Sequence, residues 1–205
     1  VKFRMLPKAN VDQFFIYLDL PQSSSLGETT KAALILENVL KQQKEVTMIQ
    51  TYIGTPPILD FNGLFKAVSN RQFTHQATMR VGLLPDDQRD LSSEELVLKL
   101  RPVLNKKLES INGVKLKLIE DPPGPPVMST VQVRIQSQDE SLMKKEAMAF
   151  YPMIKKINET VDHDTTLPSS SQELNIMIDH FECSKSKVSP GQIVDTINAF
   201  YSGRI

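Results

Sequence analysis

The chain has 205 residues, 40% of them hydrophobic, and its 24 Lys and Arg residues are balanced by 24 Asp and Glu residues. This length and composition support a folded core, and the zero net charge excludes an overall field that recruits nucleic acid or an anionic membrane surface. The single cysteine, Cys183, excludes an internal disulfide and a thiolate metal cluster.

The first 120 residues alternate between strand and helix patterns. Apolar residues at every even position from 14 to 20 have the period of a strand with one buried face. Ser25-x-x-Glu28 and Ser92-x-x-Glu95 are capping boxes, each followed by apolar residues at helical spacing. The predicted order is strand 13–20, helix 25–40, strand 46–53, strand 74–81, helix 92–111 and strand 114–118. We therefore expect an α+β, ferredoxin-like βαββαβ unit with an antiparallel four-stranded sheet and two helices on one face.

A proline-rich stretch, EDPPGPPVMS at 120–129, predicts a semi-rigid boundary after this unit. Beyond it, strand patterns at 130–135 and 174–178 flank a helix pattern at about 140–158, which predicts a truncated second βαβ unit. Ser189-Pro190 predicts the start of a last helix that ends at Gly203. Because half a unit leaves a sheet edge unpaired, we expect the chain to be a piece of a longer protein.

The segment TYIGTPPILDFNGLF, residues 51–65, begins as a strand, breaks at a glycine and two prolines, and then carries large apolar residues through an expected loop. The loop could tuck Phe61 and Phe65 beneath itself as a small separate cluster. It could instead line a hydrophobic binding cleft. The residues by themselves leave both interpretations open.

Motifs that carry enzyme chemistry do not stand out. His75, His163 and His180 have no ligand-spaced partners apart from the acidic residues of the polar segment 162–164. The sequence has no Gly-rich dinucleotide fingerprint, phosphate-binding loop or nucleophile elbow. Its eight methionines could bind a soft metal, but their places in helix and strand patterns favour core packing. We therefore expect no enzyme activity, no catalytic residue, no metal site and no cofactor.

Several blocks of the sequence resemble one known family. RMLPKANVDQFFIYLDLPQSSSLGETTKAALILENVL, TYIGTPPILDFNGLF and DPPGPPVMSTVQVRI resemble the second large periplasmic loop of resistance-nodulation-division (RND) efflux pumps, the AcrB-like inner-membrane transporters. LNIMIDHFECSKSKVSPGQIVDTINAFYSG resembles the stretch that follows in the same loop. The blocks occur in order and at matching separations along the whole chain, which makes the resemblance more specific than any one block.

The resemblance implies three parts. Residues 1–121 would form the first porter subdomain of the pump's C-terminal half, with the ferredoxin-like fold. Residues 127–180 would begin the second porter subdomain, and residues 181–205 would begin the docking region. In this family, substrates enter a cleft between the two porter subdomains, and a flexible loop of the first subdomain separates an outer pocket from an inner pocket.

Residues 55–65 occupy the place of that loop, so the resemblance implies that they line the substrate path, with Phe61 and Phe65 foremost. Two departures from the family pattern concern other candidates. Lys115 and Lys117 stand where drug exporters place pocket phenylalanines, and Met128 lies near one position of the methionine cluster of heavy-metal exporters. The full set of substrate-path candidates is Thr55, Pro56, Pro57, Phe61, Asn62, Phe65, Lys115, Lys117 and Met128.

The resemblance predicts the periplasmic substrate-path portion of a proton-driven pump that exports small amphiphilic or lipophilic compounds. Its implied partners are these small molecules, two further copies in a homotrimer, a periplasmic adaptor protein and an outer-membrane channel, and no nucleic acid. The expected location is a periplasmic loop of a bacterial inner-membrane protein. Two alternatives stay open, namely the porter domain of a heavy-metal (Cu/Ag) exporter and a soluble ferredoxin-like ligand-binding or interaction module.

Overall fold

The computed structural model describes residues 10–59, 63, 68–120, 129, 131–157, 160–167 and 175–202. The chain divides into two compact units, residues 1–169 and 170–205. The first unit contains β1 (Gln13–Asp19), α1 (Leu26–Leu40), β2 (Val46–Ile53), η1 (Val68–Asn70), β3 (Gln76–Leu83), η2 (Asp86–Gln88), α3 (Ser93–Lys107), β4 (Lys115–Glu120) and α4 (Glu140–Lys155). The second contains α5 (His180–Lys185) and α6 (Pro190–Ser202).

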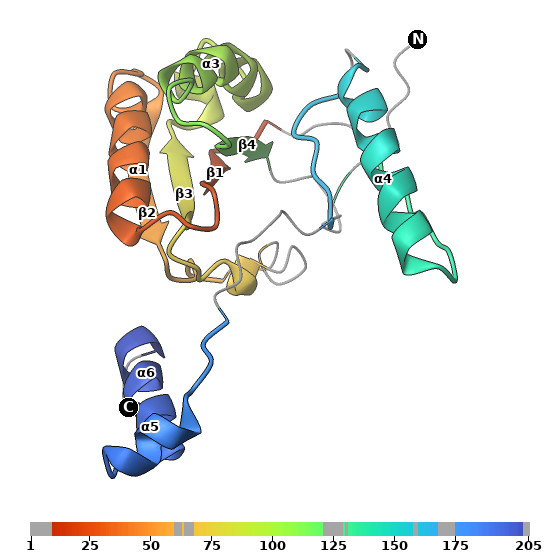
Figure 1. Cartoon of the computed structure of the whole chain (residues 1–205). Helices are drawn as coiled ribbons and strands as arrows, with labels where there is room; N and C mark the ends of the chain where they lie inside the picture. Colours follow the sequence, from red (N-terminus) through yellow and green to blue (C-terminus); the bar gives the residue numbers. More distant parts are fainter. Residues whose placement is uncertain are drawn as a thin grey trace. The chain divides into compact units, whose positions relative to one another are not determined.

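The four strands form one antiparallel sheet in the order β2-β3-β1-β4 (Figure 1). The central strand β1 places Ile16 opposite Met79 of β3 and Leu118 of β4. Helices α1 and α3 contact each other and lie over the same face of the sheet. This arrangement confirms the predicted ferredoxin-like unit, and the observed bounds of its elements differ from the predicted ones by four residues or fewer.

The core of this unit lies between the sheet and the two helices. The alternation predicted for β1 puts Phe14, Ile16 and Leu18 on the helix-covered face, where none of them is exposed to solvent. The helices contribute residues at helical spacing, including Leu36 and Leu40 from α1 and the fully buried leucines 96, 100 and 104 from α3. The strand period and the helix period therefore place their apolar residues in one buried layer between the sheet and the two helices.

Both core helices begin where the sequence predicts. The Ser25 and Ser92 hydroxyl groups accept hydrogen bonds from the Glu28 and Glu95 amides, at 3.3 Å each, and the two glutamates reach back to the serine backbone amides. These boxes satisfy amide donors that the first helical turn leaves unpaired. They also hold the pKa of both glutamate carboxyl groups below the ordinary value, because the carboxylates accept hydrogen bonds from the serines.

The structure describes part of the second predicted unit. Helix α4 forms as predicted, but residues 131–135, and 175–178 within the predicted strand 174–178, pair with no strand in the part of the chain that the structure describes. The sheet of the first unit shows the physical reason. Its β1 and β2, which flank α1, are not neighbours, because β3 lies between them. A βαβ segment of the same topology lacks that middle strand, so its two outer segments have no ladder to join.

The proline-rich boundary at 121–128 lies outside the described residues. The predicted last helix is present as α6, and a short helix, α5, precedes it without having been predicted. Asp179 caps α5 by accepting hydrogen bonds from the amides of Phe181 and Glu182. A helix of six residues is too short to show a helical period of apolar residues, so the capping residue Asp179 is the sequence signal that could have predicted α5.

Replacing a core leucine should destabilise the first unit far more than replacing an exposed leucine of the same helix. Leu100→Ala removes a side chain that is 1% exposed, and we expect a loss of about 2–5 kcal/mol in the free energy of unfolding. Leu98 of α3 is 54% exposed and provides the matched control as Leu98→Ala. Urea unfolding monitored by circular dichroism measures both changes. Equal losses for the two variants would contradict the described core.

Candidate functional site

The sheet face opposite the helices carries a second set of side chains. Because Phe14, Ile16 and Leu18 point into the core, Phe15 and Tyr17 point to the other face. There they form a small buried cluster with Val68 of η1, and Ile119 of β4 packs against it. Since η1 belongs to the connection between β2 and β3, this cluster holds the end of the 54–75 connection against the sheet.

Arg71 fixes the connection at the same place. Its guanidinium group pairs with both carboxylate oxygens of Asp19, at 2.8 and 3.3 Å. It also donates to the carbonyl groups of Leu18 and Ala77 and to the Thr78 hydroxyl group. The guanidinium carbon lies 4.7 Å from the centre of the Tyr17 ring. A planar fork of five donors suits this combination of carboxylate, carbonyl, hydroxyl and aromatic partners, which a lysine could not reproduce.

His75 ends the connection just before β3. Its ring stacks on Phe73, with ring centres 5.7 Å apart. Partial burial lowers the pKa of His75 and outweighs the opposing attraction of Asp19, while Arg71 lowers it further. The imidazole is therefore held towards its neutral form beside the Arg71–Asp19 pair.

The predicted loop begins at Gly54, whose φ of +63° favours glycine and turns the chain away from β2. Thr55 and Pro56 are exposed, whereas Pro57 is buried. Ile58 is 72% exposed and Leu59 44% exposed. Phe61, Asn62 and Phe65 lie outside the described residues. The described part thus combines one anchoring proline with an apolar pair that faces solvent.

Lys115 and Lys117 lie on β4 at alternate positions, so both are on the helix-free face with Ile119. Lys117 forms an ion pair and a hydrogen bond with Asp164, and Lys115 lies 3.7 Å from the same carboxylate. The Lys117 side chain is mostly buried, whereas that of Lys115 is half exposed. The predicted pair of lysines is therefore brought together around Asp164 of the polar segment 162–164.

Burial raises the pKa of the Asp164 carboxyl group, but the hydrogen bond and charge of Lys117 outweigh it, helped by the Thr165 amide and Lys115. The resulting pKa lies below the ordinary value of 3.8. Asp164 therefore stays ionised at neutral pH and offsets one of the two positive charges.

Met128 lies outside the described residues. Within the described ranges, no group of three or more His, Cys, Asp or Glu side chains could hold a metal ion. The lone Cys183 is buried in α5.

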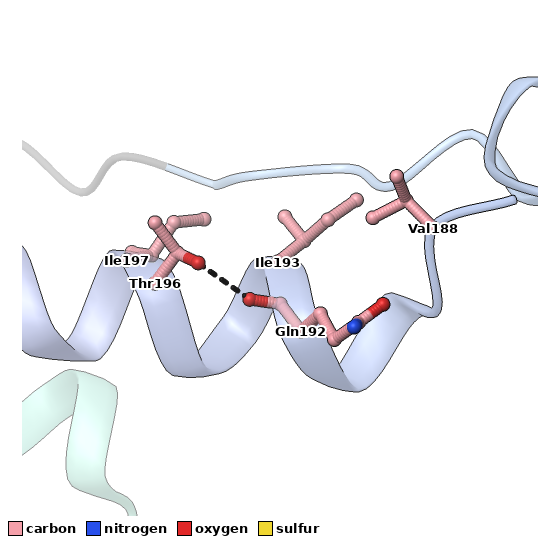
Figure 2. A pocket seen from close by; sticks show the side chains of 5 residues that line it. All are labelled: Val188, Gln192, Ile193, Thr196 and Ile197. Carbon is pink, nitrogen blue, oxygen red and sulfur yellow. Dashed lines mark hydrogen bonds between the residues drawn. The ribbon is translucent and has the colours of Figure 1, made fainter. Parts of the chain in front are cut away.

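A shallow groove of about 220 Å³ lies on the second unit (Figure 2). Val188, Ile193 and Ile197 supply its apolar lining, and Gln192 and Thr196 lie beside them. The Thr196 hydroxyl group donates to the Gln192 carbonyl group at 2.7 Å, an interaction internal to α6. The groove contains none of the predicted substrate-path residues.

Sequence reasoning missed Arg71, Asp19 and Asp164. Asp19 and Asp164 lie 52 and 47 residues from their partners Arg71 and Lys117, so no local spacing could reveal the pairs. The available signal was an arginine and a carboxylate at the ends of strand patterns, where side chains from neighbouring strands converge.

The family model described as the AcrB/AcrD/AcrF family matches residues 2–205. The chain belongs to the AcrB/AcrD/AcrF family. This finding confirms the resemblance to RND transporters read from the sequence blocks. A search of curated proteins gave no match to the chain.

Two solved structures share the fold of this family member. Both are described as X-ray crystal structures of a heavy metal efflux pump, in crystal forms II and I. Their TM-scores are 0.66 and 0.64, at 13% and 14% sequence identity, and they cover 95% and 94% of this chain. The chain spans 20% of the length of each. Among the described residues of this chain, no helix is long and apolar enough to cross a membrane.

Removing the arginine from the Arg71–Asp19 pair should destabilise the first unit of this family member. Arg71→Met leaves the Asp19 carboxylate, only 19% exposed, without its ion-pair partner, and we expect a loss of about 3 kcal/mol in the free energy of unfolding. Lys44→Met is the control, since it breaks the exposed pair with Asp90 and should leave stability unchanged within error. Chemical denaturation compares them, and an unchanged Arg71→Met stability would refute the anchoring role.

Asp164 should make the first unit sensitive to acid. A carboxyl group with a lowered folded-state pKa contributes stability at pH values above its unfolded pKa and loses it as pH falls through the folded pKa. The stability due to the Asp164–Lys117 pair should therefore be present at neutral pH and decline below 3.8. In urea unfolding, Asp164→Asn should be less stable than the parent at neutral pH, with the difference vanishing in acid. A constant difference at every pH would contradict this assignment.

Proposed function

We propose that the chain is the periplasmic substrate-path portion of a proton-driven RND efflux pump that exports small amphiphilic or lipophilic compounds. Family membership supports the transporter assignment. The observation that carries the substrate class is the exposed Ile58 and Leu59 on a connection whose other end is fixed to the sheet by Arg71. A connection with exposed apolar residues near its start and a polar, anchored end suits a ligand that has both kinds of surface.

The helix-free sheet face supports the same substrate class. Phe15 and Tyr17 are buried there under η1, and the half-exposed Lys115 gives the β4 border of this face positive charge. Such a face suits an amphiphile whose apolar body contacts the loop and whose polar group lies near β4. We propose a binding and conducting role for this face.

The proposed partners follow from the family. We propose that the intact pump is a homotrimer that works with a periplasmic adaptor protein and an outer-membrane channel, and that protons drive it through residues of its membrane part. This chain would lie in the periplasm and contribute the substrate path.

Heavy-metal export is the second candidate, because both similar structures are described as heavy metal efflux pumps. At 13% and 14% identity these similarities support a shared fold and leave the cargo open. This candidate predicts that Cu(I) or Ag(I) binds the chain and that Met128→Ile abolishes binding in isothermal titration. Absence of binding heat with either ion would count against it.

The transport proposal is tested in the intact pump by changing the tip of the loop. Ile58→Ala and Phe61→Ala should each alter the range of amphiphilic compounds that cells tolerate, because both remove apolar surface from the proposed path. Leu34→Ala is the matched control, since Leu34 of α1 is 50% exposed but lies on the helix layer. Drug susceptibility and dye efflux are measured at equal expression. Identical profiles for all three variants and the parent would reject the proposed path.

A further inference from the structure

Residues 160–167, here called the strap, lie against the border of the first unit. Asp162 pairs with Arg101 of α3 and accepts a hydrogen bond from the Leu118 amide at 3.3 Å. Asp164 pairs with Lys117, as described above. The His163 carbonyl group accepts a hydrogen bond from the Tyr151 hydroxyl group of α4 at 3.2 Å. The strap therefore contacts β4, α3 and α4 at once.

Strand β4 is an edge of the sheet in the described part of the chain, where it pairs with β1 alone. An edge strand presents unpaired amide and carbonyl groups to any extended chain that approaches it. The opposite edge, β2, has a register irregularity between Val46 and Met48, which is one recognised way of discouraging such pairing. Strand β4 has regular register along its whole length, so it needs another form of protection.

Leu118 shows what that protection is. Its amide donates to Asp162, and its carbonyl group accepts from the Arg101 guanidinium at 3.1 Å. Both backbone groups therefore point away from β1 and towards the strap. In an antiparallel ladder this orientation alternates, so Leu116, two residues earlier, has the same outward orientation. No partner for the outward Leu116 amide is found among the described residues.

The two side chains reproduce what a neighbouring strand would supply. A strand partner offers one acceptor and one donor to each outward-facing residue, and Asp162 and Arg101 offer the same pair to Leu118. Their mutual ion pair is 15–17% exposed, so each side chain is held in place by the other. Asp162 has a φ of +57°, a region that aspartate adopts more readily than most residues.

We propose that the strap is a cap on the β4 edge, in which Asp162 and Arg101 replace a strand partner at Leu118 and so connect α4 to the sheet. The cap satisfies the Leu118 backbone, holds the Tyr151-bound His163 at β4 and keeps this part of the edge from pairing with another chain. The proposal concerns contacts within one unit and does not depend on the transport proposal.

Amide hydrogen exchange of the isotopically labelled 205-residue chain tests the cap by NMR. In the unmodified chain, Leu118 should exchange at least about tenfold more slowly than Leu116, although both amides face outward, because only Leu118 has an acceptor. The Asp162→Asn substitution keeps the side-chain shape and a residue type that tolerates a positive φ. It removes the negative charge that pairs with Arg101. It should accelerate Leu118 exchange about tenfold and leave Leu116 unchanged.

Lys115→Gln is the matched control, because it removes the half-exposed partner of Asp164 without touching Leu118. It should leave Leu118 exchange unchanged. Equal exchange rates of the Leu118 and Leu116 amides in the unmodified chain would overturn the proposal. This comparison does not depend on the folding of any variant. Unchanged Leu118 exchange in Asp162→Asn, with core amides still protected, would overturn it as well.

Discussion

The structure depends on one arginine that fastens a long connection to the sheet. Arg71 lies near the end of the 54–75 connection and bonds the Asp19 carboxylate together with the backbone of β1 and β3. A guanidinium group that is only 13% exposed must find such partners, because leaving either charge unpaired at this depth is costly. The Arg71–Asp19 pair fixes where the connection returns to the sheet, so both ends of the connection lie at defined points of the sheet.

The two faces of the sheet carry different sets of side chains. The helix-covered face carries the main apolar core, which includes Ile16 of β1 and packs against Leu100 of α3. On the opposite face, Phe15 and Tyr17 are buried under η1, beside the ion pairs that Arg71 and Lys117 form within the unit. Both faces therefore stabilise the sheet, and the exposed Ile58 and Leu59 are left for the proposed binding role.

The sequence predicted the first unit well because each of its elements displays a local signal. Alternation in β1 and the capping boxes at Ser25 and Ser92 depend on neighbours within a few residues, and the structure confirms all three. Residues 131–135 of the predicted strand 130–135 pair with no described strand, and local signals do not decide this, since a strand exists only when a distant segment pairs with it. Lys115 and Lys117 were identified from the family pattern, but their shared partner Asp164 depends on the folded course of the chain.

In the proposed function, the exposed Ile58 and Leu59 of the anchored connection contact transported compounds. Ile58→Cys in the intact pump, with Cys183→Ser to remove the other thiol of this chain, allows the tip to be labelled by a maleimide. Leu34→Cys in the same background reports on an exposed position of the helix layer. An exported amphiphile should slow labelling at position 58 and leave labelling at position 34 unaffected. Labelling at position 58 that is unchanged by saturating substrate would contradict it.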